Sequence, residues 1–514
     1  MKKPSCLRNY LYLFCGFLLI IFPSKSFSQD NFLFFQILDQ KSQQPVVFAT
    51  VEIKSEGRGT IADENGMFKV PAEFKQKKMT VSCIGYYTKT LTITGTGNKE
   101  ISKILLAPKT EILDVVTITA KNKSYEVIKK ADEIVKKSIQ NLLLNFPTQP
   151  HSYTGYYRDY QYVNDQYFNL NEAIIKDYDA GFHSNKIFDK GNRTALYTYS
   201  RNDDFPVDEG LLIPYQADSK KFIESSSISG FGGNELTILN IHNAIRRFDK
   251  NSFSFVYVFR KDFPYNHQFR IQSVVEINDT PMYKIAFYAL ENVVGAYHKA
   301  DGYIYIDCKD FGIHKFEYFG YLKKEEDPLY ALTVEYKTKD DRYYLNYISF
   351  YNKFKAKSSK SFKISTTVVD SENTQIVIAF NQEIDKKSLR KNSQIKVKGN
   401  GKKIKTTDFK FISEKEIAIS VNDFAQVETA YFDDLLEIDV KRVKDVAGRR
   451  LNQIDVIDAK QYREFFVQEV KIKDEPSKNL KYLNTLEDLN SAPLNPDKDI
   501  EKSFWINSPL IKSK

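Results

Sequence analysis

Five successive segments between residues 282 and 350 carry the pattern that most constrains this fold. They are MYKIAFYAL (282–290), GYIYID (302–307), IHKFEYF (313–319), YALTVEY (330–336) and RYYLNYISFY (342–351). Aromatic and β-branched residues at this density favour strands, and the short polar stretches between the segments favour turns. The pattern therefore predicts successive hairpins of one antiparallel sheet.

The chain of 514 residues is too long for a single hydrophobic core, so we expect several domains. Apolar residues at three- and four-residue spacing predict helices at 124–146 and 234–248. Strand and turn signals dominate elsewhere, so we predict a mainly β, multidomain protein. Its expected parts are a signal peptide (1–28), a small β-sandwich (29–108), a linker and helix (109–149), a β-rich domain with one or two helices (150–360), a second β-sandwich (361–470) and a polar tail (471–514).

The first 28 residues have the features of a secretory signal. A basic start precedes an apolar stretch, residues 10–22, that is too short for a membrane span. The sequence Ser-Phe-Ser (26–28) then offers small residues ahead of a cleavage site. We therefore expect an exported protein, located in the periplasm or at the periplasmic face of the outer membrane.

The net charge and the cysteine content limit the classes of partner and the disulfides that this chain can have. Removing the signal removes four basic residues and no acidic residue, which lowers the formal net charge from +9 to +5. This mild excess does not indicate nucleic-acid binding. The signal also holds two of the four cysteines, which leaves Cys83 and Cys308. A disulfide between them and two buried thiols are both compatible with the sequence.

A cluster of polar residues, Asp63, Glu64 and Asn65, interrupts an alternating apolar stretch and ends at Gly66. A calcium loop needs alternating oxygen ligands and a later bidentate acid, and the next five residues contain no acid. Asn-Gly, in contrast, supplies the positive φ angles of a tight hairpin turn. We therefore interpret Asn65 and Gly66 as a structural turn, and we expect the Asp63 side chain to contribute nothing to stability or to calcium binding.

Three blocks follow one another in the first sandwich: QPVVFATVEI (44–53), GTIADENGMFKV (59–70) and VSCIGYYT (81–88). They resemble the carboxypeptidase regulatory-like domain, a transthyretin-like sandwich that is frequent in exported proteins of Bacteroidota-type bacteria. As a whole, the chain resembles carboxypeptidase-like regulatory domain-containing proteins of that type. The resemblance implies a non-catalytic accessory domain. Within the third block, we expect Gly85 to form the corner after Cys83.

Two later regions carry further resemblances. The blocks IVIAFNQEIDKKSL (376–389) and VKRVKDVAGRRLN (440–452) resemble the bacterial Ig-like domain, which implies an Ig-like β-sandwich with a turn at Asp445 and Gly448. Residues 302–318 resemble the curved half-barrel sheet of periplasmic lipoprotein carriers, which implies a curved antiparallel sheet in the 150–360 domain.

A zinc carboxypeptidase site is the first chemistry to test, because His314 and Glu317 have the H-x-x-E spacing. His314 is the last histidine, so no third ligand follows it, and residues three apart in a strand point to opposite faces. Paired acids, such as those at 203–204 and 325–327, leave an unrecognised hydrolase as a distant alternative. We predict no catalytic residue, no metal and no cofactor.

The tyrosine-rich stretch 153–168 leaves two interpretations open. Tyr153 and Tyr157 can line a pocket for a lipid or another hydrophobic ligand, or they can simply fill a half-exposed sheet. From the domain types, we expect a non-catalytic cell-envelope protein that binds or scaffolds an envelope partner. The alternative is a periplasmic carrier or sensor of a hydrophobic ligand that uses the 150–360 sheet.

Overall fold

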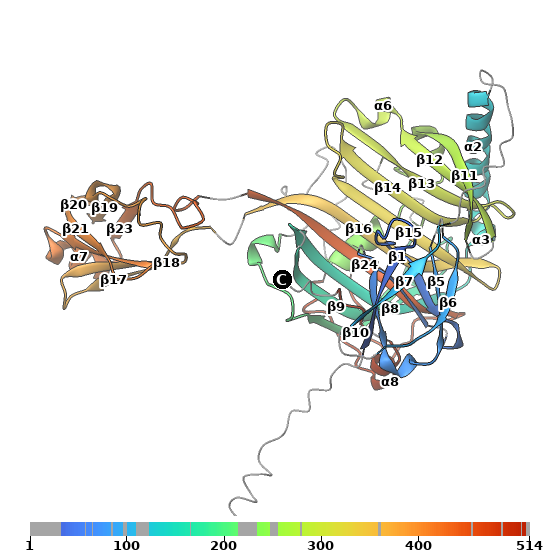
Figure 1. Ribbon diagram of the computed structural model, residues 1–514, viewed down its shortest axis with the longest axis horizontal. Coiled ribbons are helices and arrows are strands. Elements are labelled where there is room, and N and C mark those ends of the chain that lie inside the picture. Colours follow the sequence, from blue (N-terminus) through green and yellow to red (C-terminus); the bar gives the residue numbers. More distant parts are fainter. Residues whose placement is uncertain are drawn as a thin grey trace, which may run out of the picture.

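The computed structural model describes residues 32–509, apart from 57, 64, 84–85, 96–99, 109–122, 165, 214–233, 247–254, 278–279, 358–360, 454–455, 485–486 and 505. Its described strands form five sheets accompanied by short helices, so the protein is mainly β and multidomain (Figure 1). This confirms the fold class predicted from the sequence. The predicted signal peptide lies outside the described residues.

One ten-stranded sheet organises the body of the molecule, and every pair of neighbours in it is antiparallel. In spatial order its strands are β10 (Arg193–Arg201), β9 (Gln166–Asp179), β8 (His151–Val163), β24 (Val456–Ile472), β16 (Arg342–Lys357), β15 (Tyr330–Lys339), β14 (Ile313–Leu322), β13 (His298–Asp307), β12 (Thr280–Ala289) and β11 (His267–Ile277). The five segments predicted as hairpins are β12 to β16. β15 and β16 meet at Asp340 and Asp341, whose φ angles of 48° and 57° fit a two-residue hairpin turn.

Strand β24 corrects the predicted domain boundary at residue 470. It follows the second sandwich in sequence, yet it pairs with β16 on one side and with β8 on the other. Residues 456–470 therefore belong to the large sheet, and residues 361–453 form a module inserted between two central strands. Alternating apolar residues cannot reveal this, because a strand pairs by the same pattern wherever it lies.

The inserted module (residues 361–453) lies apart from the body in Figure 1 and consists of two sheets and one helix. One sheet contains β17 (Ile364–Asp370), β18 (Gln375–Phe380), β22 (Glu416–Val421) and β21 (Thr406–Phe411), and the other contains β20 (Lys402–Ile404), β19 (Ile395–Gly399) and β23 (Leu436–Val440). Helix α7 (Phe424–Phe432) joins β22 to β23. An apolar core of its own, with Ile378, Val397 and Val427 fully buried, holds the two sheets together.

The N-terminal sandwich likewise has two sheets that pack around a separate hydrophobic core. One sheet contains β4 (Met67–Pro71), β1 (Phe32–Asp39) and β7 (Ile101–Leu106). The other contains β3 (Arg58–Ile61), β2 (Thr50–Ile53), β5 (Lys78–Ser82) and β6 (Lys89–Thr92). Phe35 and Phe68 stack at 5.1 Å between ring centroids in this core. The sandwich lies against one face of the large sheet, where Thr50 Oγ1 donates a hydrogen bond to Glu335 at 2.8 Å.

One long helix and several short ones cover the opposite face of the large sheet. They are α2 (Lys123–Gln140), α3 (Leu142–Asn145), α4 (Glu235–Ile241), α5 (Phe263–Asn266) and α6 (Glu291–Val294). The predicted helix 124–146 is divided at Asn141 into α2 and α3, and the predicted helix 234–248 ends early, at His242. Asn234 caps α4 by accepting a hydrogen bond from the Thr237 backbone. None of the helices in the described part of the chain is long and apolar enough to cross a membrane.

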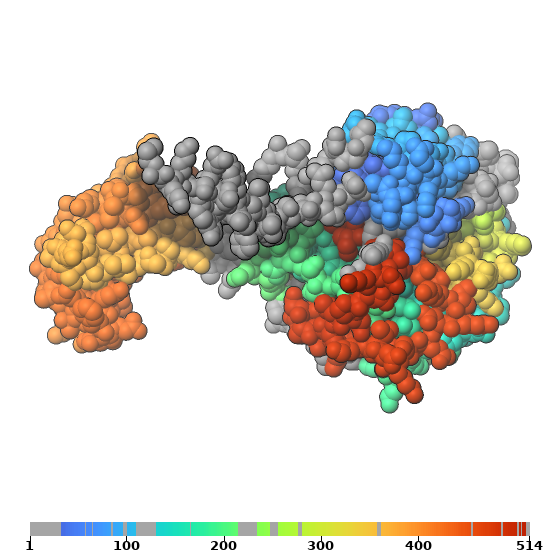
Figure 2. Space-filling view, turned by 90° about the horizontal axis from the view of Figure 1, so that it is seen from below, coloured from blue at the N-terminus to red at the C-terminus, as the bar shows by residue number. Residues whose placement is uncertain are grey.

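The C-terminal segment packs against the body instead of standing free. Leu483 and Leu494 lie beside edge strand β10, through a backbone hydrogen bond to Thr194 and a parallel bridge to Leu196. After α8 (Lys498–Ser503), Asn507 bonds to the backbone of the N-terminal sandwich at Ile61 and Lys69. Figure 2 shows the red C-terminal residues beside the blue N-terminal domain. The tail therefore ties the sandwich to the sheet.

Candidate ligand pocket and buried ion networks

A cavity of about 190 Å³ lies at the β10 edge of the large sheet, between the helix-covered face and the tail. Its lining comes from four separate parts of the chain. They are strand residues Asp177, Arg193 and Thr194, loop residues Lys186, Ile187 and Asn192, α4 residues Leu236, Thr237 and Asn240, and tail residues Tyr482 and Leu483. The cavity thus mixes charged, neutral polar and apolar side chains, which suits a small polar ligand better than a lipid chain.

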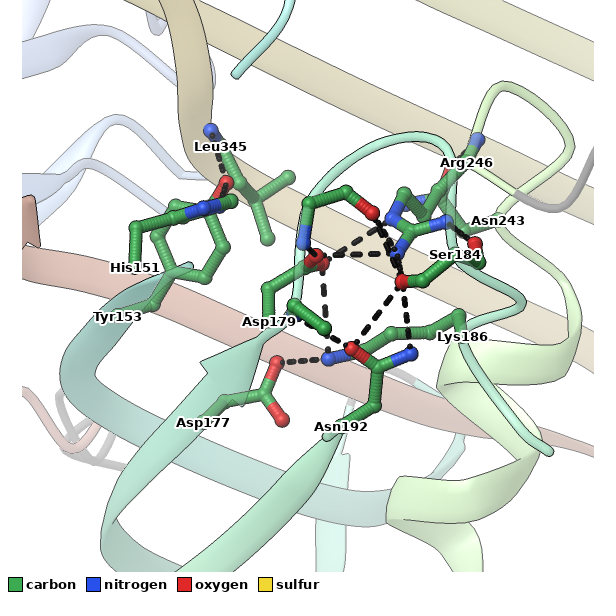
Figure 3. A network of polar contacts seen from close by, with 12 residues as sticks. His151, Tyr153, Asp177, Asp179, Ser184, Lys186, Asn192, Asn243, Arg246 and Leu345 are labelled. Carbon is green, nitrogen blue, oxygen red and sulfur yellow. Dashed lines mark hydrogen bonds and ion pairs between the residues drawn. The ribbon is translucent and has the colours of Figure 1, made fainter. Parts of the chain in front are cut away.

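A buried ion network forms the floor behind this cavity (Figure 3). Lys186 Nζ lies 2.7 Å from Asp177 and 3.9 Å from Asp179, and Arg246 donates two hydrogen bonds of 3.0 Å to the Asp179 carboxylate. All four side chains are at most 7 % exposed. Burial alone would raise the pKa of Asp179, but Arg246 and Lys186 hold that pKa well below its ordinary value. The Asp179 carboxylate is therefore ionised, and its charge is balanced by Arg246.

The same network fixes the loop 180–192 that forms one wall of the cavity. Arg246 donates to the carbonyl oxygens of Gly181 and Ser184, and also to the Ser184 hydroxyl. The Asn192 amide accepts from the Ala180 backbone and donates to Ser184 Oγ and to a loop carbonyl. Because these contacts satisfy the polar groups of the loop from within, the wall is preformed.

His151 lies near the network but does not complete a catalytic arrangement. Its Nδ1 lies 2.9 Å from the Gln149 carbonyl oxygen, and its Nε2 lies 2.9 Å from the Tyr153 hydroxyl. Burial lowers the pKa of His151, although Asp179 opposes this. The imidazole is thus neutral and already hydrogen-bonded at both nitrogens.

A second ion network lies on the other face of the sheet, beneath the N-terminal sandwich. Arg158 Nε donates to Glu464 at 2.5 Å, and the Tyr347 hydroxyl donates to the same carboxylate at 2.6 Å. Tyr156 donates in the same way to Glu172. Burial raises the pKa of Tyr156 and of Tyr347 well above the ordinary value, so both phenols act as neutral donors. This network joins neighbouring strands β8, β9, β16 and β24.

The polar cluster at residues 63–66 forms a turn in the structure. Gly66 has a φ of +69°, and a Cβ at this position would lie 2.5 Å from the Ile37 carbonyl oxygen. Asp63 Oδ1 accepts hydrogen bonds of 2.8 Å from the backbone of Asn65 and of Met67. The Asp63 carboxylate is therefore part of the turn, contrary to our expectation that its side chain contributes nothing to stability.

The other predicted turn residues fall into two groups. Gly85 lies outside the described residues. In the inserted module, the Asp445 carboxylate accepts from Arg449 at its backbone and its Nε, at 2.8 and 2.7 Å, and Gly448 has a φ of +83°. The two residues thus stand in one tight turn, with an ion pair across it.

Tyr153 and Tyr157, the possible ligand-lining aromatics, are buried in the apolar core of the helix-covered face. Tyr153 is 6 % exposed and Tyr157 is fully buried. Neither side chain lines the cavity at the β10 edge. They therefore fill the core of the sheet, but the sheet is covered at this place and not half-exposed as the sequence interpretation had it.

The H-x-x-E motif sits in an irregular part of β14. A shift of strand register occurs between Ile313 and Lys315, so the simple alternation of faces fails at His314. His314 and Lys315 both line a small cavity under the N-terminal sandwich, while Glu317 pairs with Lys315 at 2.9 Å. Among the described residues, no group of three histidine, cysteine or acidic side chains is placed to hold a metal ion.

The ion network of Asp177, Asp179, Lys186 and Arg246 was not predicted from the sequence. Alternate acids in a strand were the available signal, because the spacing of two puts Asp177 and Asp179 on one face. The two cationic partners come from distant segments and could not be paired in advance. The sequence did not decide whether Cys83 and Cys308 form a disulfide, and in the structure neither of them does.

Comparisons with known proteins identify one domain. Three solved structures are weakly similar to this chain, with TM-scores of 0.20 to 0.22, which are too low to support a structural argument. A DUF1329 family protein from Desulfovibrio piger is 8 % identical (TM-score 0.20), and the match covers 44 % of this chain and 85 % of that chain. A LolA superfamily protein from Nitrosomonas europaea is 10 % identical (TM-score 0.20; coverage 43 % and 85 %), and a putative outer membrane lipoprotein-sorting protein domain from Vibrio parahaemolyticus is 12 % identical (TM-score 0.22; coverage 44 % and 86 %). No curated protein matches the chain. Residues 36–118 match the family model of the CarboxypepD_reg-like domain, so the chain is a carboxypeptidase regulatory-like domain-containing protein.

Proposed function

We propose that this chain is a non-catalytic, exported cell-envelope protein that acts as a binding or scaffolding module. The observation that carries the proposal is the insertion of a complete two-sheet module between central strands β16 and β24. The N-terminal sandwich and the C-terminal tail pack against the large sheet, while the inserted module lies apart from the body (Figure 1). This arrangement suits a fixed base that presents a separate contact surface.

Sheet edges of the inserted module provide that surface. Strand β17 pairs on one side only, with β18. Its sequence ISTTVVD is rich in β-branched residues, and Val368 is 50 % exposed. An edge of this kind can accept an extended strand from a partner through backbone hydrogen bonds. We propose that an envelope protein binds here by strand addition.

Site-specific cross-linking in cells tests this proposal. A photoreactive residue at position 366 of the full chain, an exposed site on the same strand two residues before Val368, is expected to capture a defined envelope protein. The variant Val368→Lys should abolish the captured band, because a charge on an edge strand opposes strand addition. The matched control is Val446→Lys, the same substitution at a 66 % exposed position in a turn. No captured protein, or equal capture in both variants, would contradict the proposal.

A second proposal is a carrier or sensor of a hydrophobic ligand on the helix-covered face. Tyr257, Tyr265 and Tyr297 support it, since they expose 37 %, 72 % and 79 % of their surface next to the large apolar core. Tyr265 belongs to the short helix α5, and the other two lie on loops. The cavity of about 190 Å³ is smaller than the several hundred Å³ that such ligands fill, so a ligand would have to open this face.

Mass spectrometry of an organic extract from residues 29–514, purified gently from a bacterial periplasm, tests the carrier proposal. A lipid present at one copy per chain is the expected result for a carrier. An extract equal to that of an unrelated periplasmic protein purified in parallel would exclude it. Neither result affects the strand-addition experiment, so the two proposals are tested separately.

A further inference from the structure

The cavity at the β10 edge has a positive charge excess. Lys186 and Arg193 line it, against the single acid Asp177, while Asp179 and Arg246 neutralise each other behind it. Lys186 is already paired with Asp177 at 2.7 Å. Arg193, which is exposed to solvent, is therefore the lining cation without a carboxylate partner among the described residues, and a ligand with one negative charge would neutralise it.

Arg193 is also geometrically available. Its Nε donates to the Lys190 carbonyl oxygen at 3.1 Å, and its guanidinium lies 5.1 Å from the Tyr482 ring centroid. Its two terminal nitrogens make no hydrogen bond or ion pair with any residue that the structure describes. A guanidinium held by its Nε and an aromatic ring presents a fixed fork, which matches a carboxylate in a bidentate way.

The opposite wall presents neutral hydrogen-bonding groups. Thr237 and Asn240 stand three residues apart on α4, and both line the cavity. Within the described part of the chain, neither side chain has a hydrogen-bond partner, although Thr237 is only 5 % exposed. Both side chains can therefore form hydrogen bonds with hydroxyl groups of a ligand.

The cost of the buried ion network supports a role in binding. Replacing such networks with apolar side chains is often neutral or stabilising, so stability alone does not explain four buried charges. What the network does here is hold loop 180–192 and the ammonium of Lys186 in fixed positions. A preformed wall raises affinity because less order is lost on binding.

We propose that this cavity binds a small carboxylate that also carries hydroxyl groups, such as a sugar acid. Arg193 would bind the carboxylate, and Thr237 and Asn240 would bind hydroxyls. The volume of about 190 Å³ restricts the ligand to a molecule smaller than the drug-sized compounds that occupy larger pockets. The inference does not depend on strand addition at β17, because the inserted module does not line the cavity.

Calorimetric titration of the mature chain with D-glucuronate tests the proposal, with D-glucose as the neutral match. Glucuronate is expected to bind saturably with a Kd of about 1 mM or lower, and glucose to bind about tenfold more weakly or not at all. The variant Arg193→Gln should weaken glucuronate binding about tenfold. Its matched control is Arg201→Gln, an exposed arginine of the same strand that does not line the cavity.

A second variant tests the hydroxyl contacts. Thr237→Val keeps the shape of the side chain and is expected to weaken glucuronate binding several-fold, without a change in the binding of acetate. No glucuronate binding at about 10 mM, equal binding of glucose, or equal affinities in Arg193→Gln and Arg201→Gln would overturn the proposal. Circular dichroism of each variant ensures that a loss of binding is not a loss of fold.

Discussion

The two faces of the ten-stranded sheet are covered in different ways. On the helix-covered face, Phe263, Phe287 and Phe316 pack ring against ring, with centroids 5.0 to 5.6 Å apart. On the face under the N-terminal sandwich, a buried Arg158–Glu464 ion pair lies among aromatic side chains. The first face resembles a single-domain core, and the second is an interface between distant parts of the chain. We infer that the first sets global stability and the second sets the arrangement of the parts.

The largest expected effect is on the helix-covered face. Phe316→Ala removes a fully buried ring that contacts Phe259, Phe263 and Phe287, and should lower the free energy of unfolding by about 3–5 kcal/mol. Denaturant titration of the full chain measures it. Phe432→Ala, at a 77 % exposed position in the inserted module, is the control and should change little. Equal effects would break the comparison.

Breaking the ion pair on the other face should be almost as costly. Arg158→Met leaves the Glu464 carboxylate buried without its cation, which should cost about 3 kcal/mol. The double variant Arg158→Met with Glu464→Leu should recover most of that loss, because both charges are then absent. Denaturant titrations of the single and double variants measure the difference. A double variant as unstable as the single one would show that the pair itself is strongly stabilising.

Phe504→Ala should act on the arrangement of the parts, not on the sheet. The ring is 6 % exposed, contacts the Arg58 guanidinium at 4.0 Å and belongs to an apolar cluster with Ile61 and Tyr347. We expect a loss of about 2 kcal/mol in tail docking. Limited proteolysis should then cut the tail sooner, while the unfolding midpoint of the body stays the same. Phe188→Ala, at a 49 % exposed position, is the control.

Much of the fold could be predicted because its determinants are local. Strands β12 to β16 follow one another in sequence, and each turn is encoded by nearby residues such as Asp340 and Asp341. The start of α4 was likewise predicted near residue 234, where Asn234 caps the helix. Local patterns of this kind need no knowledge of the rest of the chain.

The remaining features depend on contacts across the chain. β24 lies 99 residues after the end of β16, and nothing in its own sequence shows that it returns to pair with β16. The register shift at His314 is equally invisible, because it arises from pairing with β13. In the candidate pocket, Asp177 was visible as one of two alternate acids, but Lys186, Arg193 and Thr237 are brought to it only by the tertiary fold.

The helix-covered face also holds one group that should make stability depend on pH. Burial, followed by the charge of Glu235, raises the pKa of Asp159 to about 7. Hydrogen bonds from Asn171 and Tyr157 and the charge of Arg463 lower this pKa but only partly offset the rise. The folded state thus keeps a proton that the unfolded state loses near its ordinary pKa of 3.8. Stability should therefore fall as the pH rises from about 4 to 7, and then level off.

The variant Asp159→Asn tests this sign. It keeps the shape and removes the titration, so the decline between pH 4 and 7 should become flatter, and the variant should gain relative to the wild type as the pH rises. Melting temperatures at half-unit pH intervals measure both. Asp408→Asn, at an exposed site in the inserted module, is the control. A wild type that grows more stable across this window than the Asp159→Asn variant would contradict the raised pKa.

The smallest expected effect concerns the turn at residues 63–66, where the sequence and the structure disagree about one side chain. Asp63→Ala removes two hydrogen bonds of 2.8 Å to the backbone of Asn65 and Met67, and should destabilise the N-terminal sandwich by about 1 kcal/mol. Gly66→Val should cost more, because its Cβ would meet the Ile37 carbonyl oxygen at a positive φ. Hydrogen exchange within the sandwich measures both, with and without calcium. Protection that rises with calcium in the wild type, and not in Asp63→Ala, would show that the turn is a cation site after all.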